Sequence, residues 1–192
     1  MKSVARLLTL GAVAVASSLS IPAAAGQPSP AVFKAATKEG RVWVSVDLTR
    51  QRLTEPYVPF VVVIYNDAKN SVELRRNDLK LIGPDGKAYA VPTIPELRAA
   101  YTRQNFDMTM LRMYGMPFGT WLQPDRLIPS NFFPLVLGRG DVRIDQVEIP
   151  PLYWTVDLFY FKRPPGLAAG QEVQIEVQPQ GWKEAVRIPV KL

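Results

Sequence analysis

Alternation of apolar and polar side chains along short extended runs is the feature that most constrains this chain. Residues 42–48, 173–177 and 186–192 each place valine, leucine or isoleucine at every second position. Successive side chains of a strand point to opposite faces of a sheet, so each run predicts a half-buried strand. Short strands separated mostly by turns predict an all-β fold, an antiparallel β-sandwich.

Two other runs are apolar on both faces. Residues 59–65 are almost entirely β-branched or aromatic, and in residues 152–161 a row of leucine, valine and aromatic side chains alternates with a second row that is itself partly aromatic. A strand of this kind needs cover on both sides. We expect residues 152–161 to turn their Leu158 row inward, which leaves Tyr153, Phe159 and Phe161 facing outward.

A β-hairpin is predicted between residues 79–82 and 87–91. The intervening residues, 83–86, have the sequence Gly-Pro-Asp-Gly. Proline presets the backbone of a turn, and glycine supplies the positive φ that hairpin turns need. Asp85 is therefore interpreted as a turn former and not as an acid catalyst.

Residues 93–140 differ from the rest and are interpreted as an insertion. Thr93 and Glu96 have the spacing of a capping box, and an apolar stripe follows at helical spacing. We expect one helix over about 94–113, within a helical part of about 93–116, and then an irregular loop rich in proline, glycine and aromatic residues. The helix and loop are expected to pack on one sheet and close a second, smaller core.

The first 25 residues have the three-part layout of a secretory signal peptide. Basic residues lie near the start, residues 7–19 form an apolar run, and residues 23–25 are alanines that suit a cleavage site. The apolar run is shorter than the roughly 20 residues that a membrane-spanning helix needs. We expect cleavage near Ala25, export to the periplasm or the medium, and a mature single domain, 26–192, without a membrane span.

The absence of two residue types excludes much chemistry. The chain has neither cysteine nor histidine, so it cannot form disulfides, Ser–His or Cys–His nucleophilic pairs, or zinc sites built on those ligands. Its net charge is +6, but the arginines are scattered and form no basic run. We therefore expect a non-catalytic protein that needs no cofactor and binds no nucleic acid.

Part of the chain resembles bacterial secreted immunoglobulin-like domains of the telokin-like type. The matching features are a hydrophobic strand that ends at an asparagine (Phe60 to Asn66), a leucine pair followed by Asp85-Gly86-Lys87 and then a tyrosine, and a glycine turn before a valine-rich strand (158–177). The resemblance implies an immunoglobulin-like sandwich with a binding or scaffolding role. It transfers no functional residue, and the insertion departs from the pattern.

Four methionines, Met108, Met110, Met113 and Met116, lie within nine residues. Thioether sulfurs are soft ligands that select Cu(I). Met108 would face away from Met110 and Met113 on a helix, however, and flexible methionine is more commonly used in a core or on a partner-binding surface. Copper binding, core packing and partner binding all remain open here, with core packing favoured.

The outward aromatic row is the second candidate binding surface. Tyr153, Phe159 and Phe161, joined by Trp121, could stack on a sugar or a peptide. The alternative, which we favour, is that the insertion covers them. In either case a groove between the insertion and the sheet is the best place for a ligand.

The leading hypothesis is an exported, non-catalytic binding or scaffolding module that contacts another envelope protein. A carrier of a small apolar ligand or Cu(I) is the alternative. An enzyme that uses carboxylates alone would need two acids about 5–10 Å apart in a cleft, and no pattern in the sequence places such a pair.

Overall fold

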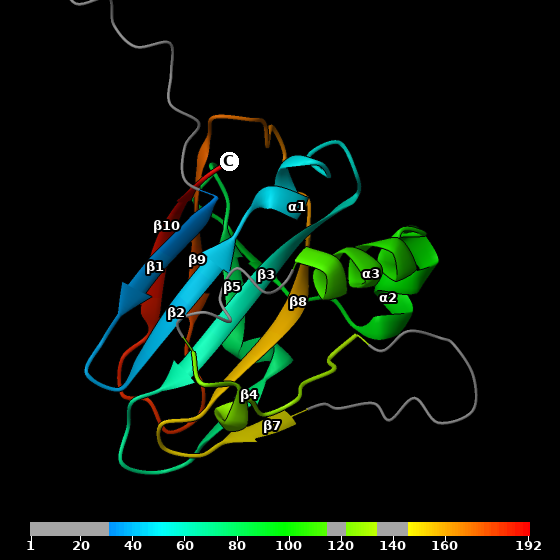
Figure 1. The fold of residues 1–192 in the computed structure, drawn as a ribbon. Coiled ribbons are helices and arrows are strands. Elements are labelled where there is room, and N and C mark those ends of the chain that lie inside the picture. Colours follow the sequence, from blue (N-terminus) through cyan, green and yellow to red (C-terminus); the bar gives the residue numbers. More distant parts are fainter. Residues whose placement is uncertain (1–30, 115–121, 134–145) are drawn as a thin grey trace, which may run out of the picture.

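The computed structural model describes residues 31–114, 122–133 and 146–192 (Figure 1). Within them the chain forms two four-stranded antiparallel sheets and a two-stranded ribbon. The first sheet has the order β1 (Val32–Ala36), β2 (Gly40–Ser45), β3 (Tyr57–Asn66), β8 (Trp154–Lys162). The second has the order β10 (Val186–Lys191), β9 (Glu172–Val177), β5 (Leu79–Ile82), β6 (Ala88–Ala90), and β4 (Val72–Arg75) pairs with β7 (Gln146–Ile149). The predicted β-rich, antiparallel architecture is confirmed.

The main core lies between the two sheets, one behind the other in Figure 1. Four β3 side chains on one face, Val58, Phe60, Val62 and Ile64, are fully buried. Leu79 and the inward residues of β9 and β10, Val173, Ile175, Val177, Val186, Ile188 and Val190, are buried at 3 % exposure or less. This is the arrangement that the period of two predicts for residues 173–177 and 186–192.

The predicted hairpin joins β5 and β6. The Gly83 amide donates to the carbonyl of Lys87 at 2.9 Å, and the Lys87 amide donates to an Asp85 carboxylate oxygen at 3.1 Å. Gly86 has a φ of 73°, which L side chains adopt only with strain. Asp85 is thus the turn former that the sequence predicts.

The first alternating run is only partly a strand. β2 ends at Ser45, and residues 47–50 form a short helix, α1 (Asp47–Arg50). Val46 and Leu48 are still buried, at 0 % and 7 % exposure. A period of two over a few residues does not distinguish the end of a strand from one helical turn that buries the same side chains.

Helices cover the outer face of the first sheet beside β8 (Figure 1). Tyr101 lies between α2 (Ile94–Ala100) and α3 (Gln104–Tyr114), and its ring centroid is 6.4 Å from that of Tyr57 and 5.4 Å from that of Tyr160. Phe133 packs edge-on against Tyr160 at 5.2 Å. The insertion therefore does pack on one sheet, as the two-sided apolar strands require.

The single helix expected over 94–113 is wrong. The capping box at its start is present, with the Thr93 amide donating to Glu96 at 2.7 Å, but α2 ends at Ala100 and Tyr101 is extended (φ −135°). Residues six apart lie on different faces of a continuous helix. The break instead brings the Tyr101 hydroxyl to the Asp107 carboxylate, to which it donates a hydrogen bond.

In the part of the chain that the structure describes, none of the helices has the length and apolar character that crossing a membrane requires.

Candidate functional site

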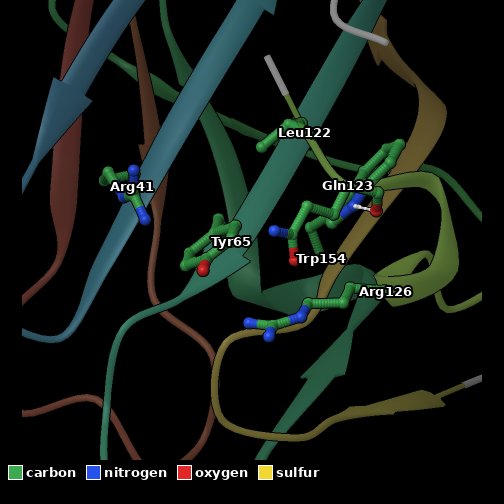
Figure 2. A pocket seen from close by; sticks show the side chains of 6 residues that line it. All are labelled: Arg41, Tyr65, Leu122, Gln123, Arg126 and Trp154. Atoms are coloured by element: carbon green, nitrogen blue, oxygen red, sulfur yellow. Dashed lines mark hydrogen bonds between the residues drawn. The ribbon is translucent and has the colours of Figure 1, made fainter. Parts of the chain in front are cut away.

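A hollow of about 180 Å³ opens where the insertion meets the outer face of the first sheet. We call it the seam pocket; it is lined by Arg41, Tyr65, Leu122, Gln123, Arg126 and Trp154 (Figure 2). This is the place where the sequence predicts a groove between insertion and sheet.

The sheet side of the seam pocket comes from three neighbouring strands. Arg41 of β2 is the antiparallel partner of Tyr65 of β3, and Tyr65 is in turn the partner of Trp154 of β8. Directly paired residues present their side chains on the same face of a sheet. The strand register thus places a cation and two aromatic rings in one row across the sheet.

The insertion side is held by hydrogen bonds to β8. The Ile128 amide donates to the carbonyl of Trp154 at 2.8 Å, and the Trp154 indole donates to the carbonyl of Gln123 at 2.9 Å. The Thr155 hydroxyl donates to the carbonyl of Ile128 at 2.8 Å. These bonds fix residues 122–128 along β8, including the short 3₁₀ helix η2 (Pro124–Arg126).

Arg41 is held rigidly in the seam pocket. Its Nε and one Nη donate to the two carboxylate oxygens of Asp67 at 2.7 and 2.9 Å, and its guanidinium carbon lies 4.0 Å from the centre of the Tyr65 ring. The hydrogen bond to Asp67 raises the pKa of Arg41 above its ordinary value. A stacked, bidentate arginine keeps its position without a ligand.

Arg126 lies on the insertion side of the seam pocket and differs from Arg41 in its ion pairing. Among the described residues, no ion pair includes Arg126. Figure 2 shows its guanidinium and the amide of Gln123 extending toward Tyr65. The seam pocket therefore presents several hydrogen-bond donors, and no carboxylate is among its lining residues.

A second polar cluster lies buried under α3. Arg52 Nε donates to Asp107 at 3.0 Å, and the Tyr101 hydroxyl donates to the other Asp107 oxygen. The Tyr160 ring packs against Tyr101, and its hydroxyl has no hydrogen-bond partner among the residues that the structure describes. Burial raises the pKa of Asp107 above its usual range, although Tyr101 and Arg52 oppose that shift. Asp107 is fully buried, so the cluster fastens α3 to Tyr101 and to Arg52 in the turn after α1, and it does not present an acid to a substrate.

Asp157 fastens the loop that follows the helices. Its carboxylate accepts the amides of Phe132 at 2.9 Å and Leu158 at 2.7 Å, and its exposure is 2 %. Burial raises the pKa of Asp157 from its ordinary 3.8 to about 6. The side chain is thus buried at the edge of β8 and bonded to the segment that runs beside it.

The outward orientation expected for Phe159 and Phe161 is wrong. Both are buried, at 1 % and 0 % exposure, and Phe161 packs against Phe60 with ring centres 5.8 Å apart. They share their face of β8 with the polar residues Thr155 and Asp157. In the structure those groups bond to residues 128–132 at the sheet edge, so the face can be polar in part and still point inward.

The other members of the aromatic row are not brought together with them. Tyr153 is half-buried in the turn before β8, and Trp121 lies outside the described residues. The row therefore does not form one exposed surface among the residues that the structure describes. A role for these side chains in binding stays a prediction.

The methionines divide in a similar way. Met108 is buried in the core at 8 % exposure, and Met110 packs against the core. The side chain of Met113 and all of Met116 lie outside the described residues. Core packing is thus confirmed for two of the four methionines, and Cu(I) binding stays untested. In the described parts of the chain, histidine, cysteine, aspartate and glutamate form no group that could hold a metal ion.

Sequence reasoning missed all the residues of the seam pocket. Arg41 lies at the start of an alternating run, and Tyr65 ends the apolar run 59–65, but nothing in either run indicates that the two are paired. Only the register of β2, β3 and β8, together with the path of residues 122–128, brings the pocket residues together.

Comparisons with protein-family models, with curated proteins and with solved structures found no match for this chain.

Proposed function

We propose that this protein is an exported, non-catalytic binding module that contacts another envelope protein through the seam pocket. The observation that carries the proposal is the pairing of a stacked, immobilised arginine with an arginine that has no ion-pair partner among the described residues, across a hollow between insertion and sheet. Surface arginines held in this way favour recognition of a partner group.

The chemistry of the seam pocket supports binding more than catalysis. Among the described residues that line it, the titratable side chains are two arginines and a tyrosine. Arginine cannot be deprotonated in proteins and therefore cannot act as a general base. The two buried carboxylates, Asp107 and Asp157, are both engaged in bonds that hold the insertion in place.

The scaffold in this proposal is an immunoglobulin-like sandwich. The hydrophobic strand that ends at Asn66, and the β5–β6 hairpin, are features of the secreted domains that the sequence resembles. Export rests on the signal-peptide layout of residues 1–25, and the expected check is an intact mass equal to residues 26–192 for the protein recovered from cells. An unprocessed mass would contradict export.

The main alternative, a carrier of a small apolar ligand or Cu(I), receives less support. The seam pocket has two cations and an amide in its lining, and Met108 and Met110 are engaged in core packing. An apolar ligand would leave the pocket's donors without acceptors, which costs binding free energy.

Site-specific photocrosslinking in the producing cell tests the proposal. A benzoylphenylalanine replaces Gln123 at the seam pocket in one strain and Arg187, on the exposed face of the second sheet, in another. We expect one exported protein to be crosslinked from position 123 and not from position 187, and the purified partner to bind this protein in a titration. Equal crosslinking from both positions, or none from position 123, would overturn the proposal.

A further inference from the structure

We propose that the seam pocket recognises a carboxylate, and that on the partner this is an acidic side chain next to an apolar residue. The inference rests on the proposed function and names the chemistry that the pocket selects. Three observations carry it: the polarity of the lining, the local charge and an exposed leucine beside the pocket.

The side chains that line the seam pocket favour a ligand that accepts hydrogen bonds. Arg126 and Gln123 offer N–H donors toward the hollow and Tyr65 is part of its lining, while the Trp154 indole is already bonded to the carbonyl of Gln123. A planar carboxylate can accept two parallel bonds from one guanidinium, which fixes both its position and its orientation.

The local charge favours a group with one negative charge. Asp67 balances Arg41 through two hydrogen bonds, so among the described residues that line the pocket the charge of Arg126 is the one without an ion-pair partner. A carboxylate neutralises that single charge, whereas a dianionic phosphate would exceed it. Desolvating an unbalanced charge is costly, so the balance selects between the two anions.

An exposed leucine next to the pocket indicates where the neighbouring residue of the partner would lie. Leu152 is 47 % exposed and has a φ of 67°, an uncommon backbone conformation for a branched side chain. Its amide donates to the carbonyl of Asn66, the residue after Tyr65, at 2.8 Å. It therefore lies at the same end of the first sheet as the pocket.

The turn that carries Leu152 is held firmly. Asn66 is fully buried, its side-chain amide donates to the carbonyls of Asn70 and Ile149 at 2.9 Å, and its backbone amide donates to the carbonyl of Tyr153 at 2.9 Å. A strained residue persists where its surroundings hold it, and such residues cluster at functional sites. Leu152 is thus presented to solvent by the fold, at the end of the first sheet that also carries the cationic pocket.

The test is an NMR titration of the purified protein that follows the Trp154 indole N–H, since this group bonds to the pocket residue Gln123. The probes are acetate, inorganic phosphate and two peptides with blocked ends, Gly-Leu-Asp-Leu-Gly and its asparagine analogue Gly-Leu-Asn-Leu-Gly. We expect saturable shifts with the aspartate peptide, at least tenfold weaker binding of the asparagine peptide, and acetate binding weaker than that of the aspartate peptide.

Three variants separate the contributions. Arg126→Gln should weaken the aspartate peptide at least tenfold, while the matched Arg187→Gln on the second sheet should leave its affinity unchanged. Leu152→Gly, which suits the positive φ, should weaken the peptide several-fold and leave acetate binding unchanged.

Three outcomes would overturn the inference, and a fourth would overturn the proposed function instead. Tighter binding of phosphate than of acetate would contradict the carboxylate. Equal affinity for acetate and the aspartate peptide would show that the pocket takes a free acid. The absence of any saturable shift, with crosslinking from position 123 retained, would remove this inference and leave the proposed function standing. Carboxylate binding without any crosslinked partner would do the reverse.

Discussion

The outer faces of the two sheets differ in polarity and in exposure to solvent. On the second sheet, β10 alternates buried and exposed residues along its whole length, and its exposed Arg187 forms an ion pair with Glu176 of β9. On the first sheet, by contrast, eight of the ten residues of β3 and seven of the nine residues of β8 are buried, so both strands bury side chains on both faces. The insertion provides the cover that makes this arrangement stable.

A strand that is apolar on both faces of an antiparallel sheet therefore indicates that a further layer of the protein packs on the outer face. The second sheet needs no cover over β9 and β10 because their outward residues, apart from Pro189, are polar or charged. The first sheet acquires α2, α3 and residues 122–133, and the incomplete fit of that layer leaves the seam pocket. Stability and the candidate binding site therefore arise from the same layer.

Among the substitutions that test the contrast between the two sheets, Asp107→Ala is expected to lower the free energy of unfolding the most. The change leaves Arg52 buried without its carboxylate, and breaking a buried ion pair costs about 3–5 kcal/mol. Urea unfolding should show this loss, and the double variant Arg52→Met with Asp107→Leu should recover much of it. A loss below about 1 kcal/mol would show that the cluster does not hold the helices.

The second largest loss of stability is expected from shortening a buried side chain of the insertion that covers the first sheet. Phe133 is fully buried against Tyr160, so Phe133→Ala is expected to lower the free energy of unfolding by about 3 kcal/mol. Phe132→Ala, the matched change at the neighbouring position that contacts Phe159, should cost a similar amount. A much smaller loss for Phe133 would mean that the outer layer is packed less tightly than the main core.

The buried carboxyl group of Asp157 is expected to make the stability of the fold depend on pH. Its pKa in the folded protein, about 6, exceeds the ordinary 3.8, so the folded state binds the proton more tightly than the unfolded state. Stability from this group is therefore highest below about pH 4 and is lost as the pH rises through 6, by about 2–3 kcal/mol in all.

A comparison of the unmodified protein with Asp157→Asn isolates the contribution of Asp157 to the pH dependence of stability, because the other carboxylates titrate in both proteins. The stability of the unmodified protein relative to the variant should fall between pH 4 and pH 7.5, as measured by urea unfolding at each pH. A difference that stays constant or rises with pH would contradict the raised pKa.

The smallest effect is expected on the uncovered sheet. Arg187→Ala removes an exposed ion pair with Glu176, in which the arginine side chain is 65 % exposed, and should change the free energy of unfolding by about 0.5 kcal/mol or less. Thermal unfolding at low and high salt measures it. A change as large as that of Phe133→Ala would erase the contrast between the two faces.

Several parts of the fold could be predicted because their causes are local. The Thr93–Glu96 capping box and the 83–86 turn depend on residues within four positions of one another, and both form as expected. The break at Tyr101 could not be predicted, because it depends on Asp107 and Arg52 meeting under α3. The orientation of Phe159 was mistaken because the partner of Asp157 is the backbone of Phe132, 25 residues away.

Antiparallel sheets, the positions of the tight turns, the need of two strands for cover on both faces, and the exclusion of chemistry based on histidine or cysteine can all be read from the amino-acid sequence. These follow from side-chain periodicity, turn propensity and composition, which act over a few residues. The tertiary structure alone decided which face of β8 points inward, where the helix breaks and which residues form the seam pocket. Those outcomes depend on strand register and on contacts between segments far apart in the chain, where the free energy of packing overrides local pattern.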